Sequence, residues 1–224
     1  MHYPLNLLAT NQKIYPLFGN QLKGEPHVFD FSSSNENIEN YDTENFQNFQ
    51  NAVFDELKRN SKTWGIGKYL EERATLLRNY QQITKEQRFF HLGLDVICEE
   101  NSSLYAPIDS RVEMAGKEEG VGNYGGYIML KHSINNGTFY SFYGHLNSNH
   151  LVKEGQNLMA GEIFGKLGIG SDSGGWFTHT HLQIITEDAF NQGLFLKGYI
   201  DKNNLENVEN LFPSPYFLFR FQPE

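Results

Sequence analysis

The feature that most constrains the fold of this chain is a set of five polar residues spread over a long central stretch. They are His91 and Asp95 in His-Leu-Gly-Leu-Asp, His145 in Tyr-Gly-His, and His179 and His181 in His-Thr-His. A catalytic metal site needs three nitrogen or oxygen ligands, an open coordination position and a nearby group that moves protons. The five residues meet these needs only if the fold brings distant segments to one cleft.

The residues around His91 alternate between apolar and polar, which is typical of a half-buried strand. A straight strand would place positions 91 and 95 about 13 Å apart, at the limit of what two side chains can share. The strand must therefore bend, and Gly93 is placed to allow it. Residues 178–185 alternate as well, so His179 and His181 project from one face, about 6–7 Å apart. One ring can bind a metal while the other reaches a water molecule on it.

These motifs resemble those of the lysostaphin-type (LytM-type) zinc metalloendopeptidases, which cleave peptides in bacterial peptidoglycan. The similarity covers about residues 88–188. It implies that zinc is bound by His91, Asp95 and His181. It also implies that His145 and His179 are the catalytic pair, one acting as base and the other as donor to the developing oxyanion.

The last motif departs from the family pattern Gly-Pro-His-Leu-His-Phe-Glu, since Trp176-Phe-Thr precedes the pair here and Leu-Gln follows it. The ligand spacing survives, so the departure concerns the substrate and not the metal. Trp176 and Phe177 are expected beside the cleft, either as core residues or in contact with substrate. Tyr143 and Trp176 are the residues that we expect to bind substrate.

Charge and composition exclude several other classes. A formal net charge of −9 disfavours nucleic acid or an anionic membrane surface as a partner. No run reaches the ~18 apolar residues of a membrane span, and the N-terminus has no signal-peptide pattern. The sequence as it stands predicts a cytoplasmic protein, or a periplasmic or extracellular one if a signal was removed. The single cysteine, Cys98, is expected to be buried.

The predicted fold is mainly β, an antiparallel sandwich or barrel, of the duplicated-hybrid-motif kind that the resemblance implies. Strands are expected near 104–108, 111–115, 127–131, 138–143 and 162–167, with a hairpin turn at Asn136-Gly137. Residues 205–212 are expected to contain a short helix. Residues 86–224 are predicted to form the catalytic domain with a C-terminal tail.

Residues 1–85 are predicted to be an N-terminal extension. It contains a helix near 44–60 capped by Asp42 or Thr43, and an acidic loop at 32–40 that is a linker candidate. Residues 62–87 are expected to be irregular or partly helical. An Asn or Glu from residues 35–45 could cover the metal; alternatively, the segment packs on the sandwich and completes its core.

The expected activity is that of a zinc-dependent endopeptidase acting on peptidoglycan stem or cross-bridge peptides. Two alternatives come from other classes. A phosphotransferase-type histidine carrier protein works through two histidines but does not need Asp95 or a His-x-His pair. A non-catalytic adaptor of the same fold would have lost metal ligands, whereas all five residues are present here.

Overall fold

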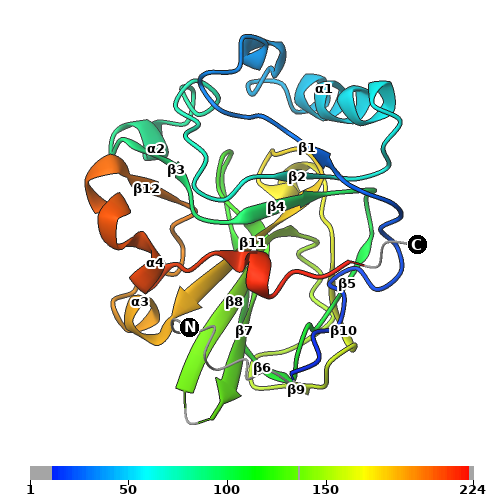
Figure 1. Ribbon diagram of the computed structural model, residues 1–224, viewed down its shortest axis with the longest axis vertical. Helices are drawn as coiled ribbons and strands as arrows, with labels where there is room; N and C mark the ends of the chain where they lie inside the picture. Colours follow the sequence, from blue (N-terminus) through cyan, green and yellow to red (C-terminus); the bar gives the residue numbers. More distant parts are fainter. Residues whose placement is uncertain (1–11, 136, 222–224) are drawn as a thin grey trace.

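The computed structural model describes residues 12–135 and 137–221, and a curved eight-stranded sheet lies at its centre (Figure 1). The strand order is β1-β2-β4-β11-β8-β7-β6-β9, and every neighbouring pair except β1 and β2 is antiparallel. The predicted mainly β fold is therefore confirmed. The strands are β1 His27–Val28, β2 Gly65–Gly67, β4 Leu94–Ile97, β6 Ser110–Glu118, β7 Gly125–Ile134, β8 Gly137–Leu146, β9 Asn157–Leu158 and β11 His179–Thr186.

A smaller layer covers one face of this sheet. It is formed by β5 (Ser103–Tyr105) and β10 (Ile163–Lys166), which pair antiparallel. Leu104 and Phe164 from this layer join Leu94 and Leu182 of the large sheet in one buried cluster. Two layers of strands thus enclose the main core, as expected for a sandwich.

The opposite face of the sheet carries the polar residues of the central motifs. In β11, His181 and Gln183 point to this face, because side chains alternate and Leu182 points into the main core. A third pair of strands, β3 (Arg88–His91) and β12 (Tyr199–Asp201), lies outside the large sheet. All eight residues of β11 are buried, so both faces of this strand are covered.

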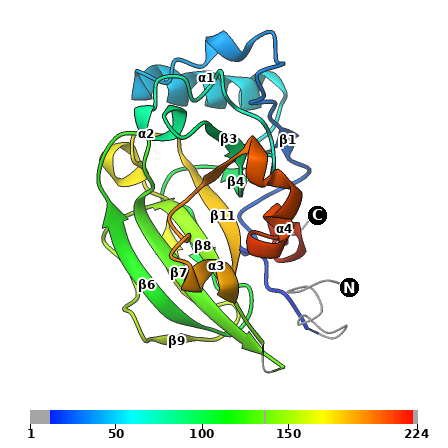
Figure 2. The ribbon, with the colours of Figure 1, turned by 90° about the vertical axis from the view of Figure 1, so that its left-hand side faces the viewer.

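The predicted N-terminal helix is confirmed as α1, Phe46–Arg59. It begins at Asn45, whose side chain accepts a hydrogen bond from the Asn48 amide, so the expected cap at Asp42 or Thr43 was wrong. The buried residues of α1 are Phe49, Val53 and Leu57. The helix lies at the end of the molecule that carries β1 and β2 (Figure 1), and Figure 2 shows it at the same end after a turn of 90°. Phe49 lies there with its ring centroid 4.8 Å from that of Phe177.

Residues 27–67 are joined to the large sheet through β1 and β2, which form its edge. The acidic loop at 32–40 is largely exposed but is anchored to the rest of the structure at two points. The Ser33 amide donates to the Glu72 carbonyl, and Ile38 is buried within a short 3-10 helix, η1, Ile38–Asn40. A domain boundary near residue 85 stays a prediction.

The remaining helices of the described part of the chain are short, and none is long and apolar enough to cross a membrane. The helix expected within 205–212 is present as α4. Strands β7 and β8 pair up to Ile134 and Gly137, while Asn136 of the predicted turn lies outside the described residues. The helices are α2 Gln81–Thr84, η2 Gly170–Ser173, α3 Glu187–Asn191, η3 Lys202–Asn207, α4 Val208–Leu211 and η4 Pro215–Phe217.

Phe49→Ala tests how strongly α1 is coupled to the rest of the fold. The change removes a fully buried ring, so we expect the free energy of unfolding to fall by about 3–5 kcal/mol. Chemical denaturation followed by circular dichroism measures this. Gln47→Ala, on the exposed face of the same helix, is the control and should change stability by less than about 0.5 kcal/mol. Equal effects of the two changes would show that α1 is not coupled to the core.

Candidate metal centre

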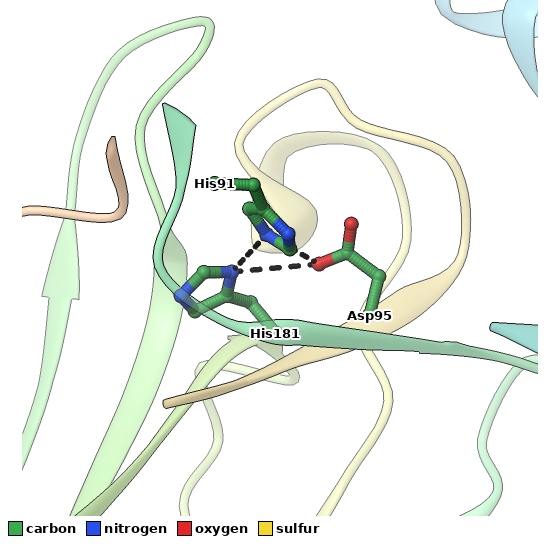
Figure 3. Close-up of side chains that lie close together, drawn as sticks. All are labelled: His91, Asp95 and His181. Carbon is green, nitrogen blue, oxygen red and sulfur yellow. Dashed lines mark hydrogen bonds and ion pairs between the residues drawn. The ribbon is translucent and has the colours of Figure 1, made fainter. Parts of the chain in front are cut away.

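Three side chains from separate strands converge on one point of the polar face (Figure 3). His91 ends β3, Asp95 lies in β4 and His181 lies in β11. The chain bends between β3 and β4, as predicted for Gly93. A Cβ atom on Gly93 would lie 2.4 Å from Cε1 of His181, so only glycine leaves room for that ring.

The distances between the converging atoms are short. Nε2 of His91 lies 2.9 Å from Nδ1 of His181 and 3.1 Å from Oδ1 of Asp95. The distance from Nδ1 of His181 to Oδ1 of Asp95 is 3.4 Å. All three residues are buried.

The other nitrogen of each ring faces an oxygen that can only accept a hydrogen bond. Nδ1 of His91 lies 2.9 Å from the Lys68 carbonyl, and Nε2 of His181 lies 2.8 Å from Oε1 of Gln183. The Gln183 amide is oriented by its own bond to the Lys197 carbonyl. Each ring therefore donates outward, which leaves a lone pair on the nitrogen that points inward.

These outward contacts favour the tautomers in which an imidazole lone pair of each ring faces the Asp95 carboxylate. Burial, and next the charge of Arg73, lower the pKa of His91 to about 3, so this ring is neutral near pH 7. Oδ1 of Asp95 is buried and has no hydrogen-bond donor among the described residues. Such a set is repulsive unless a cation lies among its members. Two histidine nitrogens and one carboxylate oxygen fit a catalytic zinc site.

His179 lies next to these three residues. Its Nε2 is 3.5 Å from Oδ1 of Asp95, and its Nδ1 donates to the Phe177 carbonyl at 2.7 Å. Burial lowers the pKa of His179 to about 4, although the charge of Asp95 acts in the opposite direction. The ring is therefore neutral near pH 7, with its free nitrogen directed toward the converging ligands.

His145 stacks near His179, with ring centroids 4.3 Å apart. Its Nδ1 donates to the carbonyl of Ser173 in η2 at 2.8 Å, which leaves Nε2 as the unprotonated nitrogen. Burial, and then the neighbouring His179, lower the pKa of His145. The structure thus brings together all five predicted residues.

A β-bulge in β8 turns His145 toward the cleft. Gly126 pairs with Leu146 but Ile128 pairs with Tyr143, so β8 has one residue more than β7 in this interval. His145 has a positive φ of 61°, which is unusual for a residue with a side chain. Strained backbone of this kind concentrates at functional sites.

The same bulge corrects the assignment of Tyr143. Regular alternation would place residues 143 and 145 on one side of the strand, and both were expected at the cleft. Tyr143 instead is fully buried in the main core, with its ring 4.7 Å from that of Phe164. It faces away from His181, so Tyr143 is a core residue and not a substrate contact.

A cleft of about 270 Å³ opens over the site. Trp176 lines it and is also packed against Tyr80 and Phe49, so it is both a core residue and part of the cleft wall. Its contact with substrate stays a prediction. The residues that line the cleft come from both the central motifs and the N-terminal segment, and they include Arg73, Ile83, Asp95, Tyr124, His145, His179, His181 and Tyr199.

Sequence reasoning missed Arg73 and Glu71, which lie in the stretch predicted to be irregular. Nη1 of Arg73 donates to Oδ2 of Asp95 at 2.7 Å. No local pattern singles them out, because Glu-Glu-Arg at 71–73 lies among other charged residues such as Lys68 and Arg78.

Three of the Asn and Glu residues in 35–45, the range expected to supply a side chain to the metal, have partners elsewhere. Asn35 donates to the Asp30 carbonyl, Glu39 pairs with Arg78, and Asn45 caps α1. Gly67 pairs with Asp95 across β2 and β4, and the Arg73 side chain reaches the Asp95 carboxylate.

Comparison with known protein families identifies a match over the central part of the sequence. The sequence pattern of Peptidase family M23 matches residues 89–192, which contain all five residues of the site. A comparison with curated proteins finds no match.

Several solved structures are similar to parts of the chain. A zinc-containing peptidase from Vibrio cholerae is 23% identical over 45% of this chain and 28% of its own, with a TM-score of 0.37. A putative peptidase M23 from Pseudomonas aeruginosa is 21% identical over 59% of this chain and 45% of its own, with a TM-score of 0.39. The catalytic domain of lysostaphin from Staphylococcus simulans is 23% identical over 54% of this chain and 80% of its own, with a TM-score of 0.39.

The chain spans less than half the length of the first two of these proteins. TM-scores below 0.5 carry no argument about fold, so the family assignment depends on the sequence match and on the motifs inside it. The resemblance to lysostaphin-type peptidases is thereby confirmed: the segment that holds the candidate metal centre, residues 89–192, belongs to peptidase family M23.

Proposed function

We propose that the protein is a zinc-dependent endopeptidase. One observation carries this proposal: His91 Nε2, Asp95 Oδ1 and His181 Nδ1 converge within 3.4 Å of one another in a buried site. Three nitrogen and oxygen ligands are the number and type that a hydrolytic zinc site needs. The match to Peptidase family M23 supports peptide hydrolysis as the reaction.

In this proposal, zinc supplies Lewis-acid chemistry by polarising a peptide carbonyl and activating a water molecule. His179 is the base, because its unprotonated Nε2 is the nearer of the two free nitrogens to Asp95. His145 lies beside His179 and would act as donor to the oxyanion or to the leaving amine, which requires that it first take up a proton. The two roles could be exchanged. Ser173 and Phe177 hold both rings through their carbonyls.

The proposed substrate is a peptide of bacterial peptidoglycan, by similarity to the family. The partly apolar cleft wall at Trp176 suits a peptide side chain, and the volume of about 270 Å³ suits a short stretch of extended peptide rather than a folded loop.

Removal of a ligand should remove the metal. His91→Ala, Asp95→Ala and His181→Ala are each expected to abolish stoichiometric zinc binding, because two remaining ligands hold zinc poorly. Elemental analysis of the purified variants after dialysis checks this. His150→Ala is a matched control, since this histidine bonds to the Gly116 carbonyl and lies outside the ligand set. Full zinc occupancy in all three ligand variants would overturn the assignment.

Loss of either catalytic histidine should leave the metal in place. His145→Asn and His179→Ala are expected to bind one zinc per chain but to lose about 10²–10⁴-fold in kcat, the usual contribution of a positioned acid or base. Asparagine is chosen at 145 because it tolerates a positive φ better than alanine does. Loss of zinc from either variant would mean that the ligands are wrongly assigned.

Peptide cleavage tests the substrate separately from the chemistry. The zinc-loaded protein should release new amino termini from purified peptidoglycan, measured by amine labelling and mass spectrometry, and Asp95→Ala should not. If the zinc-loaded protein cleaves other peptides but not peptidoglycan, the substrate class is wrong while the proposed chemistry stands.

A further inference from the structure

The two oxygens of the Asp95 carboxylate have different surroundings. Oδ1 faces the two histidine nitrogens, whereas Oδ2 accepts a hydrogen bond from Nη1 of Arg73 at 2.7 Å. Arg73 is only 2% exposed and lies before the segment that matches the family. A charged group therefore reaches the ligand set from a part of the chain to which no role is assigned.

Arg73 is itself fixed in place. Its Nε donates to Oε2 of Glu71 at 2.9 Å, and its guanidinium lies 5.1 Å from the centre of the Phe31 ring. The other oxygen of Glu71 accepts from the Phe31 amide and pairs with Lys68. Because both oxygens of Glu71 have partners, its carboxylate is held in place. The hydrogen bond from Nε to this carboxylate then orients the guanidinium plane so that Nη1 meets Asp95.

The backbone around Arg73 is tied to the strand that carries His91. The Arg73 amide donates to the Phe89 carbonyl, and the His91 amide donates to the Glu71 carbonyl. Glu72 and Phe90 form an antiparallel bridge. The first ligand and the arginine therefore share one rigid piece of backbone.

Space for the guanidinium comes from a glycine. Gly67 pairs with Asp95 across β2 and β4, so a side chain at this position would point to the same face as the carboxylate. A Cβ atom there would lie 2.8 Å from Nη2 of Arg73 and 3.0 Å from Oδ2 of Asp95. The empty position at Gly67 is filled by Arg73.

We propose that Arg73, held by Glu71, is a positioning residue that occupies Oδ2 of Asp95 so that only Oδ1 is presented to the metal. This inference depends on the proposed zinc site. A carboxylate can bind a metal through one oxygen or both, and partners in the outer shell decide which and are worth 10–100-fold in metal affinity or activity.

The test compares Arg73→Lys with the wild-type chain. Lysine keeps the charge but has no fork to bond Glu71 and Asp95 at once. We expect zinc affinity, measured by competition with a chelator, to fall about 10–100-fold, and the visible spectrum of the cobalt-substituted protein to change. Arg73→Ala should show the same loss, with partial recovery when guanidinium is added at a concentration that does not denature the protein.

Arg78→Ala is the matched control. Arg78 has the same chemistry and also pairs with a glutamate, Glu39, but this pair is exposed. It should leave the zinc affinity and the cobalt spectrum unchanged. Glu71→Gln is a second test variant, which keeps the size of the side chain and should weaken zinc binding in the same direction but less than Arg73→Lys does.

The outcomes separate the two proposals. If the wild-type chain binds no zinc, the proposed function fails first. If it binds zinc and the folded Arg73→Lys and Glu71→Gln variants have wild-type affinity and cobalt spectra, the positioning role is wrong. If both variants lose the circular dichroism spectrum of the native fold, Arg73 is a structural residue and the positioning role is overturned as well.

Discussion

The convergence of three acceptor atoms at one point is the constraint on which the surrounding structure depends. Left to themselves, two imidazole nitrogens and a carboxylate oxygen would repel one another, so the fold must hold them together. It does so from outside the cluster. The Lys68 carbonyl and the Gln183 side chain each accept a hydrogen bond from the outer nitrogen of one ring, and Gly93 leaves space for the His181 ring.

Much of this site could be predicted from the sequence because alternation in strands is a strong rule. It placed His179 and His181 on one face and required a bend at Gly93, and both expectations are confirmed. The rule failed at Tyr143, since one extra residue in β8 breaks the alternation between Tyr143 and His145. The local sequence does not predict such a bulge, because the bulge depends on the pairing register between β8 and its partner strand β7.

Arg73 could not be predicted for a different reason. Its role comes from contacts with Asp95 and Phe89 that are made in three dimensions, while its own neighbourhood in the sequence has no helical or strand periodicity. The N-terminal segment also supplies β2 at the edge of the large sheet. A part of the chain that lies outside the family-matched residues 89–192 therefore contacts the candidate metal ligand Asp95 directly.

The bulge in β8 decides on which face of the sheet the ring of His145 lies. Side chains alternate along a regular strand, so a strand of the same length without the bulge would place His145 on the same face as Tyr143, in the apolar core. The extra residue moves the ring to the face that carries His181, and the positive φ of His145 accompanies that change. Assembly of the site thus depends on the number of residues in a strand as well as on their identity, and a substitution leaves that number unchanged.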